Sequence, residues 1–191
     1  MTIHGSHGVH VKDNVAHDTF GHCFFLEDGG EKDTVFDGNL GLTTRKGFLT
    51  PSDTQVSSLV TYSAKSGRSY FLHFALQPST FWLTSPLVTM LNNHAAGSDE
   101  QGVGIWYLFP DKPVGPSAND TRFFADKEAK HTPITLFEDN VAHSNGNIGL
   151  ALFRRLREDH GILGCSTYAP REIPLKKSEF VPVTFNGFIG E

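Results

Sequence analysis

The sequence predicts an all-β chain that folds as one single-stranded parallel β-helix over residues 1–191, with turns of about 25 residues and long loop insertions. Three observations support this prediction. Short β-branched or aromatic runs alternate with turn-forming Gly, Pro, Asn and Asp, and 38% of the residues are apolar, which is enough for a sizeable core. Long helical periodicity is absent, and one motif recurs at distant positions.

The repeated motif contains an asparagine between two apolar strands. The stretch DNVAH stands at 13–17 and again at 139–143. Looser copies extend the series, whose spacings are 25, 54, 47 and 46 residues and whose asparagines are Asn14, Asn39, Asn93, Asn140 and Asn186. A spacing of about 25 residues fits one turn of a parallel β-helix, so we interpret each longer spacing as two turns with some loop insertion.

The repeat has a structural explanation. Asparagine tolerates the left-handed backbone of tight corners, and stacked asparagine side chains can hydrogen-bond from one turn to the next. We therefore assign DNVAH to the scaffold, including His17 and His143, which occupy the same repeat position. The stretch GHCFFLEDG at 21–29 is not repeated, and its polar residues are better candidates for function.

Two segments interrupt the repeat, near 43–78 and near 110–132. Both are polar and rich in Pro and Gly, as in RKGFLTPSDTQ and PDKPVGPSAND. Excursions of this kind commonly shape a groove along the side of a β-helix, so we expect a binding surface beside them.

Charge and composition argue against several partners. The formal net charge of −5 does not favour nucleic acid. No run approaches the roughly 18 to 20 apolar residues of a membrane helix, so we expect no membrane contact by this segment itself. Two cysteines, Cys23 and Cys165, cannot form a disulfide framework. One NDT sequon makes Asn119 a glycosylation site if the chain is secreted.

The stretches GHCFFLEDG, STFWLTSP, NNHAAGS and PVGPS, in this order, resemble the β-helix region of the family of cell-surface hyaluronidases and hyaluronan-binding proteins. Fibrocystins share a more distant version. The resemblance implies a right-handed β-helix that is extracellular, as a secreted protein or as one piece of a larger ectodomain. It further implies calcium as a cofactor, hyaluronan or another anionic glycosaminoglycan as a partner, and endo-type cleavage of that polymer. The fibrocystin likeness implies a second class, a non-catalytic carbohydrate-binding or adhesive scaffold.

Candidate catalytic residues come from the chemistry of glycosidic bonds. Hydrolysis usually needs two carboxyl groups, whereas elimination needs a base and a group that neutralises the uronate. The motifs GHCFFLEDG and NNHAAGSD offer such groups, namely His22, Glu27, Asp28, His94 and Asp99. Counting by two along a strand places Asp28 rather than Glu27 on the face of His22. His94 stands where the other copies have Val15 and Val141, so we ask whether His94, His22 and Asp28 line one groove.

Binding residues are predicted from the chemistry of an anionic sugar polymer. Trp106 and Tyr107 can stack on pyranose rings, with burial in the core as the alternative. Arg45 and Arg154 can pair with uronate carboxylates, with a solvated face as the alternative. Asp18 and Asp28 are candidate calcium ligands, although the sequence contains no dedicated calcium-binding loop.

Overall fold

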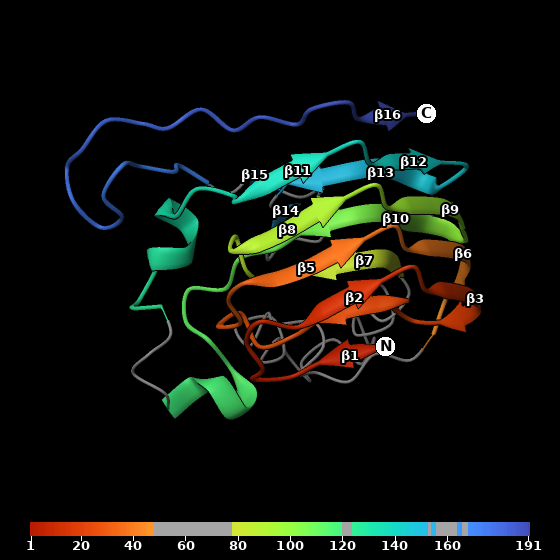
Figure 1. Cartoon of the computed structure of the whole chain (residues 1–191), viewed down its shortest axis with the longest axis horizontal. Coiled ribbons are helices and arrows are strands. Elements are labelled where there is room, and N and C mark those ends of the chain that lie inside the picture. The colour runs from red at the N-terminus through yellow and green to blue at the C-terminus, as the bar shows by residue number, and fades with distance from the viewer. Residues whose placement is uncertain (48–77, 120–123, 153, 156–163, 166–167) are drawn as a thin grey trace, which may run out of the picture.

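Four successive turns of the chain each contribute one strand to each of three parallel sheets, a fifth turn adds a strand to two of them, and the turns stack into a β-helix (Figure 1). The computed structural model describes residues 1–47, 78–119, 124–152, 154–155, 164–165 and 168–191. The strands of sheet A are β1 (Thr2–Ile3), β4 (Phe24–Leu26), β7 (Ser79–Leu83), β10 (Glu100–Tyr107) and β13 (Gly146–Leu152). Those of sheet B are β2 (His10–Lys12), β5 (Thr34–Asp37), β8 (Val88–Leu91) and β11 (Leu136–Glu138). Those of sheet C are β3 (Val15–Phe20), β6 (Leu40–Arg45), β9 (His94–Ser98), β12 (Val141–His143) and β16 (Ile189–Gly190). The predicted parallel β-helix is confirmed.

The long asparagine spacings are single turns, which corrects their interpretation as two turns each. Leu40 pairs directly with His94 in sheet C, and His94 pairs with Val141. Each of these turns therefore carries one long insertion between neighbouring strands of the stack. Sequence spacing alone cannot separate an extra turn from a long loop, because lengthening a loop adds little to the entropy of closing it.

The two predicted insertions fall at different corners of the helix. Strand β6 continues to Arg45, and residues 48–77 of the first insertion lie outside the described residues. The second insertion follows β10 and contains two 3-10 helices, η2 (Gly115–Asn119) and η3 (Glu128–His131) (Figure 1). After β13, β14 (Arg154–Arg155) and β15 (Gly164–Cys165) form a short antiparallel pair. Over the described ranges, no helix has the length and apolar character that crossing a membrane requires.

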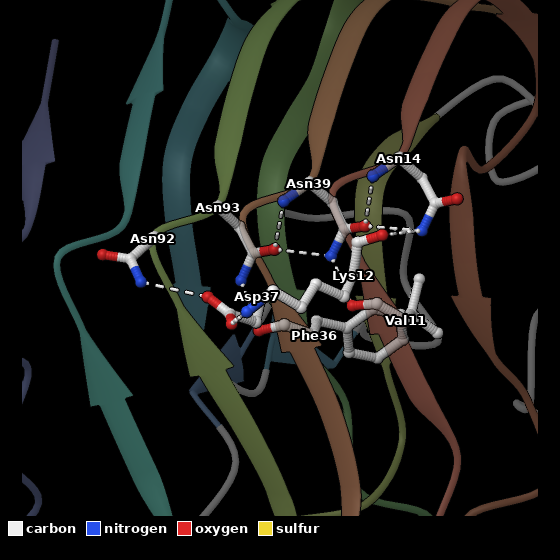
Figure 2. Close-up of polar contacts among 8 residues, drawn as sticks. All are labelled: Val11, Lys12, Asn14, Phe36, Asp37, Asn39, Asn92 and Asn93. Carbon is white, nitrogen blue, oxygen red and sulfur yellow. Dashed lines mark hydrogen bonds and ion pairs between the residues drawn. The ribbon is translucent and has the colours of Figure 1, made fainter.

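The predicted asparagine ladder runs along the corner between sheets B and C (Figure 2). The backbone N–H and the side-chain amide of Asn14 both donate to Oδ1 of Asn39, at 3.1 and 3.0 Å. Asn39 donates in the same way to Asn93, at 3.1 and 2.9 Å, and Asn93 donates to Asn140, at 2.9 and 3.0 Å. The amides of Asn39 and Asn93 also donate to main-chain carbonyls of the preceding turn. The motif DNVAH is therefore part of the scaffold.

Two details of the ladder differ from the sequence prediction. The left-handed backbone belongs to the residue before each ladder asparagine, with φ values of 54°, 67°, 53° and 53° at Asp13, Gly38, Asn92 and Asp139. Asn186 is not the fifth rung, since Val141 pairs with Ile189 and this register puts Phe188 at the ladder position. Asn186 instead bridges to Glu138, two residues earlier in the turn.

Aromatic side chains fill the interior of the helix. Phe24 of β4 stacks on Phe81 of β7 with ring centroids 4.8 Å apart, and both rings meet Phe36 of β5 edge-on, at 6.2 and 6.1 Å. All three rings are at most 1% exposed. Because these residues come from two sheets, the core joins the faces of the coil and not only successive turns.

The C-terminal segment covers one end of the stack, opposite the N-terminal strand β1 (Figure 1). Phe185 and Phe188 pack against Phe137 of β11, with ring centroids 5.0 and 5.8 Å apart. Phe137 itself is 1% exposed. These contacts keep the ring of Phe137 out of solvent.

Candidate functional site

Polar side chains gather at the corner where the chain leaves sheet A for sheet B. Ile3 of β1 pairs with Leu26 of β4, so the next residues along the two strands, His4 and Glu27, become neighbours. Asp28 follows, and the chain then turns at Gly29, whose φ is 80°. Glu27 and Asp28 are 5% and 1% exposed, whereas the side chain of His4 is 49% exposed.

His4, Glu27 and Asp28 form what we call the corner site. Nε2 of His4 lies 2.9 Å from Oε2 of Glu27, and Nδ1 of His4 lies 3.4 Å from Oδ1 of Asp28. One nitrogen of His4 and one oxygen from each carboxylate all lie within 4.8 Å of one another. Two buried carboxylates beside one accessible imidazole can transfer protons or hold a cation.

The carboxylate of Glu31 ties together the two chain segments of the corner site. It accepts hydrogen bonds from the backbone N–H groups of Asp28, Gly30 and Gly5, at 3.0, 3.1 and 3.2 Å. Glu31 is fully buried, and this burial raises its pKa even though hydrogen bonds from the backbone N–H groups of Glu31 itself, Asp28 and Gly5 act in the opposite direction. Glu31 therefore positions the loop after β4 against the residue that follows His4.

The second insertion reaches over the corner site. Ser117 of η2 donates from its hydroxyl to Oδ2 of Asp28, at 3.2 Å, and the backbone N–H of Val114 donates to the Asp28 carbonyl, at 2.8 Å. Gly115 allows this close approach, because a Cβ atom there would lie 2.5 Å from Oδ1 of Asp28. The second insertion therefore lies against Asp28, one of the three members of the corner site.

His22 does not join the corner site. It precedes β4, whereas Asp28 follows β4, so the two residues lie at opposite ends of the strand. Its Nδ1 accepts a hydrogen bond from the backbone N–H of Ser79, and its ring packs on Phe25 and Trp82 at 4.9 and 4.5 Å. The count by two fails because residues 21–23 are not in a strand.

His94 and Asp99 lie on other parts of the coil. His94 begins β9 in sheet C, and its ring lies 4.9 Å from the ring of His143. Burial lowers the pKa of His94, and the nearby His143 lowers it further. Asp99 follows β9, and its carboxylate accepts a hydrogen bond from the backbone N–H of Lys46, at 2.8 Å. The structure therefore does not bring His22, His94 and Asp28 into one groove, because each stands at a different corner or sheet.

The prediction that Trp106 and Tyr107 stack on sugar rings is wrong, because both side chains are buried. Trp106 and Tyr107 are 3% and 0% exposed, and the Trp106 ring packs edge-on against Trp82, with centroids 5.0 Å apart. Strand β10 has both faces covered, so consecutive residues are buried on opposite sides. These rings belong to the interior.

The predicted calcium ligands are also separated. The carboxylate of Asp18 pairs with the guanidinium of Arg45 on sheet C, while Asp28 contacts His4 at the corner site. Asp18 and Asp28 therefore form no common site. The side chains of Arg154 and Asn119 lie outside the described residues, and their roles as a uronate contact and a glycosylation site stay predictions.

Sequence reasoning missed His4. Its signal is its position 23 residues before Glu27, close to the 25-residue turn that the asparagines define. A short strand Thr2–Ile3 ahead of the first recognised repeat would have placed His4 beside the carboxylates.

The fold and this site define a class, namely parallel β-helix proteins with a buried carboxylate pair beside an accessible imidazole at one corner of the coil. The family model described as CEMIP beta-helix matches residues 1–150. The chain belongs to this family.

Several curated relatives are similar over most of the chain. The human protein named cell surface hyaluronidase CEMIP2 is 39% identical over 175 residues, which are 90% of this chain and 12% of that protein. The human cell migration-inducing and hyaluronan-binding protein is 36% identical over 158 residues, 80% of this chain and 11% of that protein. Mouse fibrocystin-L is 32% identical over 153 residues, 80% of this chain and 3% of that protein. The chain thus spans a small part of each relative.

Proposed function

We propose that this chain is an extracellular β-helix module that binds hyaluronan and takes part in its endo-type depolymerisation. The observation that carries the proposal is the 39% identity over 90% of the chain to a protein named a cell surface hyaluronidase. The relative named as hyaluronan-binding supports an anionic glycosaminoglycan as the partner.

The corner site is the place where we propose that the polymer is cleaved. Glycoside hydrolysis usually requires one carboxyl group as a general acid and another as a base or nucleophile. Glu27 and Asp28 are adjacent, and Ser117 fixes Oδ2 of Asp28 while Oδ1 faces His4. The half-exposed His4 is the member of the site that a polymer on the surface meets first, so we assign it the contact with the uronate carboxylate.

Incubation of the purified chain with size-defined hyaluronan tests this proposal, with product length followed by gel electrophoresis. Glu27→Gln and Asp28→Asn should each lower the cleavage rate by about 100-fold or more. Asp99→Asn, which changes a carboxylate on another corner, should leave the rate within about twofold of the unchanged chain. Cleavage that persists in both corner variants would sink the site assignment. An unsaturated product that absorbs in the near ultraviolet identifies a lyase and not a hydrolase.

The second candidate is a non-catalytic carbohydrate-binding scaffold, which the match to fibrocystin-L favours. The same experiment separates the two classes. Hyaluronan that binds the chain and keeps its length supports the scaffold and contradicts cleavage by this module.

A further inference from the structure

We propose that the corner site binds a divalent transition-metal cation of the zinc and manganese class through His4, Glu27 and Asp28. This inference does not rest on the proposed action on hyaluronan. It differs from the calcium expected from the family resemblance in the class of metal and in its ligands, since Asp28 is shared with the predicted calcium ligands but His4 and Glu27 are not.

The first argument is the geometry of the three side chains. Zinc takes nitrogen and oxygen ligands at about 2.0 to 2.2 Å, so two ligands of a tetrahedral ion are separated by roughly 3.3 to 3.5 Å. Nε2 of His4 contacts Glu27 at 2.9 Å and Nδ1 contacts Asp28 at 3.4 Å, and an ion would bind through one of these two nitrogens. One nitrogen of His4 and one oxygen from each carboxylate lie within 4.8 Å of one another, so side-chain rotations that bring these three atoms closer together would direct them at one ion.

The second argument is that other residues already orient these side chains. Ser117 holds Oδ2 of Asp28, which directs Oδ1 toward His4. Glu31 fastens the backbone of Gly5, next to His4, to the backbone of Asp28. Metal ligands in proteins are commonly fixed by such outer hydrogen bonds, because they set the orientation of the ligand before the ion arrives.

The third argument is charge. Glu27, Asp28 and Glu31 are 5%, 1% and 0% exposed within five residues of the chain. Buried carboxylates are stabilised by cations and by hydrogen-bond donors, and those of Asp28 and Glu31 already accept hydrogen bonds from Ser117 and from backbone N–H groups. A dication bound by Glu27 and Asp28 would add two positive charges to this buried corner.

The donor set selects the class of metal. Calcium takes six to eight oxygen ligands, whereas imidazole is a ligand for zinc and other transition metals. One imidazole with two carboxylates leaves further coordination positions for water, which is the arrangement of open sites and not of closed structural ones.

Metal titration of the chelator-treated chain, without hyaluronan, tests the inference. We expect Zn²⁺ and Mn²⁺ to bind at one ion per chain by isothermal titration calorimetry. Each should raise the melting temperature by roughly 5 to 10 °C at a hundredfold excess over its dissociation constant. Co²⁺ should bind at the same stoichiometry with a visible absorption band, and Ca²⁺ should give none of these effects.

Two variants and one control assign the site. His4→Phe keeps a ring at a half-exposed position but removes the imidazole that contacts Glu27 and Asp28, so we expect it to fold with a lower metal-free melting temperature and to bind Zn²⁺ at least about 10-fold more weakly. Asp28→Asn should weaken binding similarly. The control His10→Phe changes an exposed histidine of β2 and should bind as the unchanged chain does. Zn²⁺ binding that His10→Phe abolishes and His4→Phe retains would overturn the proposal in favour of surface histidines. A Ca²⁺ shift equal to that of Zn²⁺ would overturn the assigned class of metal.

Discussion

Tyr107 carries a polar hydroxyl into an apolar interior. The residue is fully buried, its hydroxyl has no hydrogen-bond partner among the described residues, and burial raises its pKa. Tyr107→Phe removes this group while keeping the ring, so we expect it to stabilise the chain by about 1 kcal/mol in urea unfolding.

Tyr168 is the matched control for this change. Its hydroxyl donates to the carbonyl of Thr132 and accepts from the N–H of Ile134, both at 2.9 Å. Tyr168→Phe loses both bonds and should destabilise the chain by about 1 to 2 kcal/mol. Equal effects of the two substitutions would contradict the assigned difference between the hydroxyls.

His94 makes the stability depend on pH. Its pKa in the folded chain is below the ordinary 6.5, because burial and the nearby His143 disfavour the proton. The contribution of neutral His94 to the unfolding free energy is therefore fully present above pH 6.5. It is lost as the pH falls below 6.5 toward the lower pKa that His94 has in the folded chain. His94→Val, which copies Val141 of the next turn, should flatten the decline in unfolding free energy between pH 7 and pH 5 by a few tenths of a kcal/mol.

Urea unfolding at the two pH values measures this effect. His17→Val, at an exposed position of β3, serves as the control and should keep the pH dependence of the unchanged chain. An identical decline in His94→Val and the unchanged chain would contradict the role of His94.

At the scale of the strand corner, the asparagine ladder joins successive turns through both side chain and backbone. Oδ1 of Asn39 accepts two bonds from Asn14, while its amide donates to Asn93 and to the Val11 carbonyl. Asn39→Ala would leave buried partners on two turns unsatisfied, so we expect a loss of about 3 to 5 kcal/mol in unfolding free energy.

Asn92→Gly provides the comparison for the ladder. Asn92 is exposed, has a left-handed backbone that glycine also adopts, and makes one side-chain bond, to Asp37. Its replacement should change the stability by less than about 1 kcal/mol. A loss as large as that of Asn39→Ala would show that the corner backbone, and not the ladder, limits stability.

The elements were predictable where a local pattern marks them. DNVAH identified the ladder because the same side-chain bonds require the same residue at each turn. The sequence predicts the left-handed backbone at the ladder asparagine, whereas it lies at the residue before it. Asparagine suits both a left-handed corner and a side-chain ladder, and the sequence alone does not distinguish these two roles. The corner site was only half predicted, because Glu27 and Asp28 stand in one motif but His4 reaches them through the pairing of β1 with β4.

Over the whole molecule, stability should depend on the ends of the stack, because each turn contacts only its neighbours. Phe188→Ala removes a ring from Phe137 at the C-terminal end, and we expect a loss of about 2 kcal/mol and a melting temperature lower by roughly 4 to 8 °C. Phe180→Ala, at a ring that is 64% exposed, should change the melting temperature by less than about 2 °C. Equal losses would contradict the capping role of Phe188.

The sequence predicted the class of fold correctly but not the number of turns. The class of fold follows from strand composition and the repeat, which act at short range. The number of turns required knowing that Leu40 and His94, 54 positions apart, are neighbours. The separation of His22, His94 and Asp28 likewise depends on which corner each strand end occupies, and this depends on pairing across turns.

In the described turns, two residues separate the end of each sheet B strand from the start of the sheet C strand that follows it. The strand ends on either side of this corner are Lys12 and Val15, Asp37 and Leu40, Leu91 and His94, and Glu138 and Val141. Every long excursion leaves the coil elsewhere. Adding or deleting a single residue at this corner would turn the following strand over and exchange its inward and outward side chains. Proteins with this fold can therefore gain surface loops at the other two corners of the coil, while the corner between sheets B and C keeps a constant length. Insertions and deletions among relatives should accordingly be absent from the two positions between each sheet B strand and the sheet C strand after it.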